Sequence, residues 1–304
     1  MGLDPVLNVG ALAALGTAFL WAITPLISVA PAARLGSIGF ARWRMYTAFV
    51  VLGAIVLYRG SWVGITQPDM QVLGVSGLIG IFLGDTLLFA SMNILGPRRA
   101  AILFSSNAAI ASILAVIFLG DHISFALGIA FASVTVGVML AIFFGRNKGN
   151  THLWEMNRGS VALGVGFGIV AAICQASGSI LAKPVMDNGA DPMAASAVRL
   201  AAAAAAHTLL LWMMPRFARN TQSLNLKTLG QVLSTSVLSM VIGMTLLMFA
   251  LANGNVSWVS ILSSISPILI LPILWIFFAK PPPIGAWFGA TLTIFGTTLI
   301  ILNT

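Results

Sequence analysis

Three ionisable side chains, Arg44, Asp85 and Arg199, lie deep inside long apolar segments of the chain. Charges at such positions in a membrane protein are costly, and they usually face a partner or a cavity. Arg44 and Asp85 both lie roughly 11–12 Å from the same end of their segments, counting 1.5 Å per helical residue. A guanidinium stabilises the ionised form of a nearby carboxylate, so we expect the two side chains to interact directly or through water. The pair is either a packing ion pair or a functional charge centre.

Arg199 differs from Arg44 in having no obvious acidic partner. Trp43-Arg44 aligns with Val198-Arg199, 155 positions apart, when the second spans of the two halves are compared, but the residue equivalent to Asp85 is Met244. A guanidinium without a protein carboxylate is available to the carboxylate or phosphate of a substrate. The alternative is that Arg199 extends toward lipid headgroups, which its depth of about 10 Å permits. Both interpretations stay open.

Polar and aromatic side chains in the same segments are candidates for the lining of a cavity around these charges. Most Ser and Thr residues in such helices bond only their own backbone. Gln175 is a stronger candidate because a buried amide needs several partners. Trp21 and Tyr46 are candidate aromatic walls, with core packing as the alternative. The remaining candidates are Thr24, Ser28, Thr86, Ser177, Ser179 and Thr245.

The chain lacks the motifs of several enzyme classes. It contains no HExxH, GxSxG or P-loop motif and no paired acidic motif for diphosphate–Mg²⁺ chemistry. Seven acidic residues among 304 leave little for metal binding or acid–base work. We therefore expect no metal, no cofactor and no enzymatic activity, and the absence of a nucleotide site excludes direct coupling to ATP hydrolysis. Secondary transport remains.

Composition requires a membrane protein. Apolar residues make up 59% of the chain and charged residues 7%, against roughly 25% charged residues in soluble domains. A soluble protein cannot bury that much hydrocarbon, so its surface must face lipid. The net charge of +8 comes from basic residues at segment ends. This pattern indicates membrane topology and not a nucleic-acid-binding surface.

Ten apolar segments predict an all-α polytopic membrane protein. Each is close to the ~20 residues that cross ~30 Å of hydrocarbon as a helix. The longest break, 146–159, predicts a linker between a first half at 1–145 and a second half at 160–304. The expected spans are 9–30, 36–58, 71–92, 100–119, 124–144, 160–182, 192–214, 228–251, 257–278 and 284–302.

Residues 84–121 and 243–280 are two copies of one segment, 159 positions apart. Nine of their 38 aligned residues are identical without a gap. Each copy lies in a half with five predicted spans, and an odd number of spans places tandem copies in opposite orientations. The sequence therefore predicts two inverted five-helix repeats.

Basic residues predict the orientation of these spans. We call side O the side reached after spans 1, 3, 5, 7 and 9, and side E the opposite side. Side E includes both termini and holds Arg59 and Lys183. By the positive-inside rule, side O is cytoplasmic and both termini are outside, in the cell inner membrane. The ten basic residues on side O are Arg34, Arg98, Arg99, Arg146, Lys148, Arg158, Arg216, Arg219, Lys227 and Lys280.

The arrangement resembles the EamA-type branch of the drug/metabolite transporter superfamily. The fourth helix of that family carries a mid-helix proline, present here as Pro267 and replaced by Asn107-Ala108 in the first copy. Gly120-Asp121-His122 resembles the turn that ends this helix, whereas the second copy has Ala279-Lys280-Pro281. Arg44 and Arg199 match an arginine often found in the second helix of each half. The resemblance implies a secondary carrier with a cavity between its halves and both termini in the cytoplasm, opposite to the charge count.

These observations favour a carrier that exports a small polar metabolite, such as an amino acid or a drug-like compound, by alternating access. Arg199 would hold negative charge on the substrate, and the Arg44–Asp85 pair would gate the site or couple transport to protons. The expected partners are the substrate and the lipid bilayer, with the chain a monomer. A flippase for a lipid-linked intermediate is a close alternative, and an intramembrane lipid transferase is a less favoured one.

Overall fold

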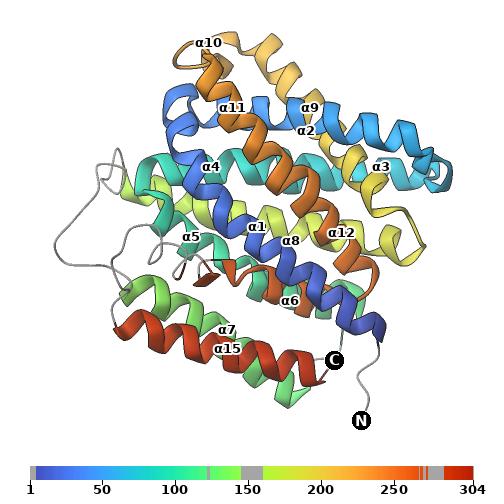
Figure 1. The fold of residues 1–304 in the computed structure, drawn as a ribbon, viewed down its shortest axis with the longest axis vertical. Helices are drawn as coiled ribbons and strands as arrows, with labels where there is room; N and C mark the ends of the chain where they lie inside the picture. The colour runs from blue at the N-terminus through green and yellow to red at the C-terminus, as the bar shows by residue number, and fades with distance from the viewer. Residues whose placement is uncertain are drawn as a thin grey trace.

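The structure, a computed structural model, is a bundle of helices (Figure 1) and describes residues 5–121, 124–144, 160–266, 268–269, 272 and 284–303. The predicted linker at 146–159, Pro267, His122 and the 279–281 turn lie outside these residues. The helices of the first half are α1 (Pro5–Leu35), α2 (Ser37–Arg59), α3 (Gln67–Ser76), α4 (Gly84–Leu95), α5 (Pro97–Ser105), α6 (Asn107–Leu119) and α7 (Phe125–Phe144). Those of the second half are α8 (Val161–Asp187), α9 (Pro192–Met213), α10 (Pro215–Ala218), α11 (Leu226–Thr235), α12 (Met244–Ala252), α13 (Val256–Ser263) and α15 (Ile284–Asn303).

Helices long and apolar enough to cross a membrane confirm the prediction of an all-α, multi-pass protein. Seven such spans occur in the described part of the chain, and Phe125–Leu140 and Ile284–Leu299 are shorter apolar helices. The ninth predicted span, 257–278, lies partly outside the described residues. Ten spans therefore stays a prediction.

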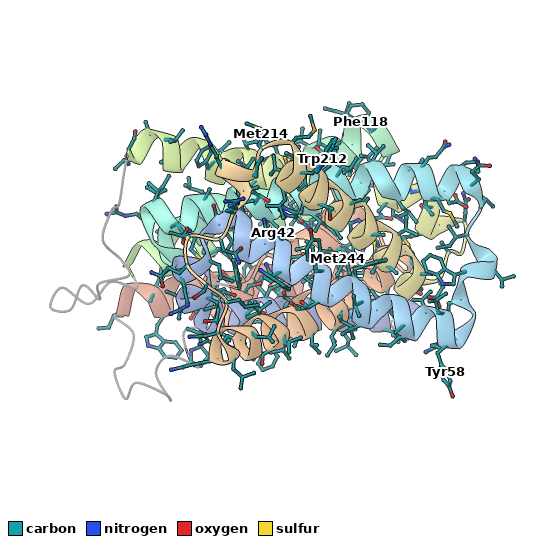
Figure 2. The ribbon with its side chains drawn as sticks, turned by 90° about the horizontal axis from the view of Figure 1, so that it is seen from above. Arg42, Tyr58, Phe118, Trp212, Met214 and Met244 are labelled. Atoms are coloured by element: carbon teal, nitrogen blue, oxygen red, sulfur yellow. The ribbon has the colours of Figure 1, made fainter. Side chains whose placement is uncertain are left out.

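Large apolar side chains cover the outer surface of the bundle. Tyr58, Phe118, Trp212 and Met214 project away from the helices, whereas Met244 lies among them (Figure 2). Exposed aromatic and aliphatic residues of this size would be unfavourable in water, but they pack well against lipid tails. The surface thus fits a protein surrounded by a bilayer.

Helices of the two halves pack against one another in matched pairs. Contacts join α1 to α12 and α8 to α4, and these two pairs correspond to each other in the sequence repeat. Contacts also join α2 to α9, α6 to α13 and α7 to α15, each a helix and its own repeat counterpart. The last pair lies side by side along one edge of the bundle (Figure 1). The interior is therefore built mainly between the halves.

Two π-helical segments interrupt equivalent spans. The segment η2 (Gly77–Leu83) joins α3 to α4, and η4 (Ser236–Gly243) joins α11 to α12. Their first residues are 159 positions apart, the offset of the sequence repeat. A π-helical turn inserts an extra residue into an α-helix and is frequent at functional sites. Both segments lie next to the charged residues described below.

A glycine lets one of these segments approach a neighbouring helix at backbone distance. A Cβ atom on Gly77 would lie 2.7 Å from the Cα of Arg199 in α9. Helix pairs in membranes use small residues in this way because close approach increases van der Waals contact. Gly77 therefore fixes Arg199 against η2.

Candidate functional site

A cavity of about 140 Å³ lies between the two halves of the bundle. One water molecule needs about 10–15 Å³ of such space, so the cavity can hold several waters or a small solute. Its lining combines charged, amide and hydroxyl groups with apolar side chains. The polar lining residues are Thr24, Ser28, Arg44, Asp85, Ser105, Asn107, Gln175, Ser239, Ser263, Ser264 and Ser266.

The predicted ion pair between Arg44 and Asp85 is present on the cavity wall. Nη1 of Arg44 in α2 lies 2.6 Å from Oδ2 of Asp85 in α4. The arginine side chain is 2% exposed, whereas that of the aspartate is 14% exposed. The carboxylate is therefore the member of the pair more accessible from the cavity, and the prediction that the two residues interact is confirmed.

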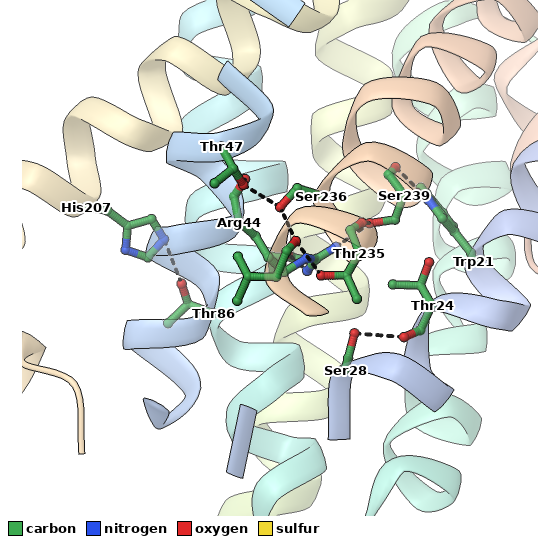
Figure 3. A network of polar contacts seen from close by, with 12 residues as sticks. Trp21, Thr24, Ser28, Arg44, Thr47, Thr86, His207, Thr235, Ser236 and Ser239 are labelled. Atoms are coloured by element: carbon green, nitrogen blue, oxygen red, sulfur yellow. Dashed lines mark hydrogen bonds and ion pairs between the residues drawn. The ribbon is translucent and has the colours of Figure 1, made fainter. Parts of the chain in front are cut away.

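A hydroxyl from the second half completes the surroundings of the Arg44 guanidinium. Nη2 donates a hydrogen bond to Oγ of Ser239 in η4 (Figure 3). The Ser239 hydroxyl in turn donates to the carbonyl of Thr235, one helical turn earlier. The Ser239 carbonyl accepts a hydrogen bond of 3.3 Å from Nε1 of Trp21 in α1. This network joins α1, α2 and η4 through polar contacts at membrane depth.

Two aromatic rings shield the same guanidinium. The Arg44 Cζ atom lies 5.5 Å from the ring centroid of Phe40 and 4.9 Å from that of Phe89. The two rings meet edge to face at 4.7 Å. A cation over a ring face is stabilised, and more so when water is excluded. The apolar shell therefore holds the charge in place and strengthens its attraction to Asp85.

Among the twelve candidate residues from the sequence, those that line the cavity include Trp21, Thr24, Arg44, Asp85 and Gln175. Ser28 also lines it, and the helix α1 continues through the cavity-lining Pro25. The hydroxyls of Thr24 and Ser28 donate to carbonyls of their own helix.

Six candidates are not among the residues that line the cavity: Arg199, Thr86, Tyr46, Thr245, Ser177 and Ser179. Thr86 lies 3.5 Å from Nε2 of His207, and the Tyr46 hydroxyl is 2.8 Å from that of Thr208. The hydroxyl of Thr245 donates to its own helix at Val241.

Arg199 is fully buried immediately behind the cavity wall. Its Nη1 contacts the sulfur atoms of Met244 and Met248, at 3.1 and 3.5 Å. Nε and Nη2 have no hydrogen-bond partner among the described residues. Arg199 does not extend toward a membrane surface in this arrangement, since its exposure is 0%.

Sequence reasoning missed several polar residues of the lining. Ser239 was not singled out, Asn107 was noted only for its place in the family motif, and the serines on and after α13 were not expected in the lining. The hydroxyl of Ser264 donates a hydrogen bond of 3.4 Å to Oδ1 of Asn107, across the two halves. A polar helix face could have been recognised from the sequence, because serines three positions apart lie on one side of a helix: Ser257, Ser260 and Ser263.

The bundle is tightly packed beyond the cavity, toward side E. Lining residues on α6 stop at Asn107, and those on α13 start at Ser263. All residues of α13, from Val256 to Ser263, are buried. At the outer ends of these helices, the Ser257 hydroxyl donates a hydrogen bond of 2.9 Å to Oδ2 of Asp121. The contacts of α6 with α13 therefore close side E.

The family model described as the EamA-like transporter family matches the chain twice, over residues 8–143 and 162–302. The chain belongs to the EamA-like transporter family. Because this family consists of transporters of the drug/metabolite type, the chain is a multi-pass membrane transporter. The resemblance drawn from the sequence is confirmed.

A solved structure shares the fold of this EamA-like chain. It is a crystal structure whose description names no function. It superposes on this chain with a TM-score of 0.78 over 97% of each chain, at 16% sequence identity. Identity at that level supports the fold and carries no statement about the cargo. No curated protein matches the chain.

Proposed function

We propose that the chain is a secondary transporter that exports a small polar metabolite, such as an amino acid or a drug-like compound, by alternating access. The observation that carries this proposal is the cavity, which both halves line and which contains an ion pair at membrane depth. Apolar walls with a few placed polar groups are typical of small-molecule sites. One closed end is what a carrier needs in one of its two states.

Two inverted five-helix repeats, at 1–145 and 160–304, would provide the alternation. The matched helix pairs across the halves and the equivalent positions of η2 and η4 support this arrangement. In such a protein, the contacts that close one side have counterparts that close the other side. Rocking of one half against the other would open side E when the Asp121–Ser257 contact separates.

The Arg44–Asp85 pair is the proposed coupling element. Both partners line the cavity, and the carboxylate is the more exposed of the two. A zwitterionic substrate can pair its anionic group with Arg44 and its cationic group with Asp85, and so replace the bond between the two side chains. A proton taken up by Asp85 would release Arg44 for a substrate anion, so either event links the pair to the cargo.

The proposed orientation places side O in the cytoplasm of a cell with an inner membrane. The cavity lining extends to Ala100, close to the start of α5 at Pro97, which lies on side O. In this orientation the cavity extends toward the cytoplasm, the side from which an exporter loads. A reporter fused after Thr304 tests the orientation: cytoplasmic reporter activity would reverse it.

A metabolite-resistance and accumulation screen tests the function. Cells that express the protein are compared with cells that lack it, and with cells that express Asp85→Asn at equal membrane levels. We expect at least one polar metabolite to accumulate less in cells with the wild type and not with Asp85→Asn. Tyr46→Phe is the matched control because Tyr46 is not a lining residue. Equal export by Asp85→Asn and wild type would remove the ion pair from the mechanism.

A further inference from the structure

Three contacts of the Arg44 guanidinium recur, position for position, around the Arg199 guanidinium. Arg44 contacts Asp85, Ser239 and Phe89. Adding or subtracting the repeat offset of 159 converts these residues into Met244, Gly80 and Met248. Arg199 contacts the same three: its Nη1 meets both methionine sulfurs, and a Cβ on Gly80 would lie 3.0 Å from its Nη2. The two arginines therefore occupy equivalent sites.

The second site has lost every polar partner of the first. A thioether replaces the carboxylate, and the hydrogen atom of a glycine replaces the hydroxyl. Sulfur is a weak acceptor and cannot balance a full positive charge. Removing one member of a buried ion pair normally leaves a strong penalty, so a guanidinium kept in this state needs an anion in some state of the protein.

The wall between Arg199 and the cavity is one residue thick. Met244 and Gly80 both touch the guanidinium, and both also line the cavity. Methionine is unbranched and changes rotamer easily. Rotation of the Met244 side chain would expose Nη1, and Gly80 offers no side chain to cover Nη2. An oxyanion in the cavity could then reach the guanidinium through two parallel hydrogen bonds.

We propose that Arg199 is a covered oxyanion-binding site, opened by Met244, for a carboxylate or phosphate group. This inference rests on the proposed transport function and names the chemical class of the cargo: a solute with an oxyanion group. In this scheme the protein neutralises Arg44 through Asp85, whereas the ligand neutralises Arg199 once Met244 has moved aside.

Thermal unfolding of the purified protein in detergent tests the site without any transport measurement. Sodium acetate and sodium phosphate are titrated at constant ionic strength against sodium chloride. We expect at least one of the two oxyanions to raise the unfolding temperature of the wild type beyond the effect of chloride. Met244→Asp should abolish this response, because the new carboxylate repeats the Arg44–Asp85 pair and occupies the guanidinium from within. Loss of charge-assisted hydrogen bonds of this kind weakens the affinity for the oxyanion by about 10- to 100-fold.

Two further variants separate charge from packing. Met244→Leu keeps an apolar cover without an acid and should retain the response, whereas Arg199→Gln should lose it. A parallel titration with an anionic phospholipid in mixed micelles distinguishes the source: a response to that lipid alone supports the site but assigns it to a headgroup. An equal response in wild type and Met244→Asp, or no response to any oxyanion in the wild type, would overturn the inference. Export that depends on Asp85 would survive either result.

Discussion

Arg44 and Arg199 show how the same residue can be used in two ways at similar depths from opposite sides of the membrane. Arg44 is held by a carboxylate, a hydroxyl and two aromatic rings, so its charge is balanced inside the protein. Arg199 is held by packing and by sulfur atoms, and two of its nitrogens lack partners among the described residues. The difference arises from three substitutions around the guanidinium: Met244 for Asp85, Gly80 for Ser239 and Met248 for Phe89.

A double-mutant cycle at the ion pair separates stability from function. Asp85→Leu leaves the Arg44 charge buried without its partner, which costs about 3–5 kcal/mol in buried pairs. Arg44→Met combined with Asp85→Leu removes both charges and should recover most of that loss, while transport stays absent. Thermal unfolding in detergent measures the first effect and the accumulation assay the second. A double variant as unstable as Asp85→Leu would contradict the assigned pairing.

The residue scale also shows what sequence can and cannot predict. Counting residues from segment ends placed Arg44 and Asp85 at one depth. The repeat alignment showed that Met244 occupies the position equivalent to Asp85, where the second half has no acid. The first inference needed only helix geometry, and the second needed only the offset between the two copies. Ser239 and Asn107 were not predictable in this way, because most hydroxyls and amides in membrane helices bond locally and their cross-helix partners depend on the packing angle.

At the scale of the elements, the π-helical segments set the positions of both arginine partners. The segment η2 ends just before Asp85, and η4 ends just before Met244. The continuous apolar spans 71–92 and 228–251 were expected to be uninterrupted helices, and the structure corrects this with a π-helical segment in each. In η2 the π-helical segment coincides with the close approach of Gly77 to the backbone of α9, a tertiary contact that composition does not reveal.

Paired glycine substitutions test the close approach of η2 to α9. Gly77→Ala places a Cβ in contact with the backbone of Arg199, so it should lower stability by about 1–3 kcal/mol through overpacking. Gly74→Ala is the matched control, since a Cβ there meets nothing within 4 Å. The control should be neutral or up to about 1 kcal/mol more stable, because alanine favours helix. Thermal unfolding of both variants measures the difference, and equal stability would show that η2 and α9 are not in close contact.

At the scale of the whole molecule, the cavity is asymmetric although the repeat is symmetric. It extends toward the start of α5 on side O, while α6 and α13 close it toward side E. A hydrogen bond between a hydroxyl and a carboxylate joins the two halves at that closed end. The sequence predicted the two halves and a cavity between them, but the closed side depends on which helix ends touch and could not be predicted.

Accessibility of a single thiol from each side of the membrane tests alternating access most directly. In a Cys174→Ala background, Ser263→Cys places a thiol in the cavity wall. An impermeant maleimide is added from side E or side O, in intact cells and in inverted vesicles. The closed state predicts preferential labelling from side O.

Ser257→Ala should then shift labelling toward side E, because it removes the hydrogen bond to Asp121. Such a bond to a charged group is worth about 1.5–3 kcal/mol, so the rate from side E should rise about 10-fold or more. Ser133→Ala is the control, because the hydroxyl of Ser133 donates only to the Ile129 carbonyl of its own helix. It should leave the labelling rates from side E and side O unchanged. Labelling confined to one side in the parent and in Ser257→Ala would contradict alternating access around this cavity.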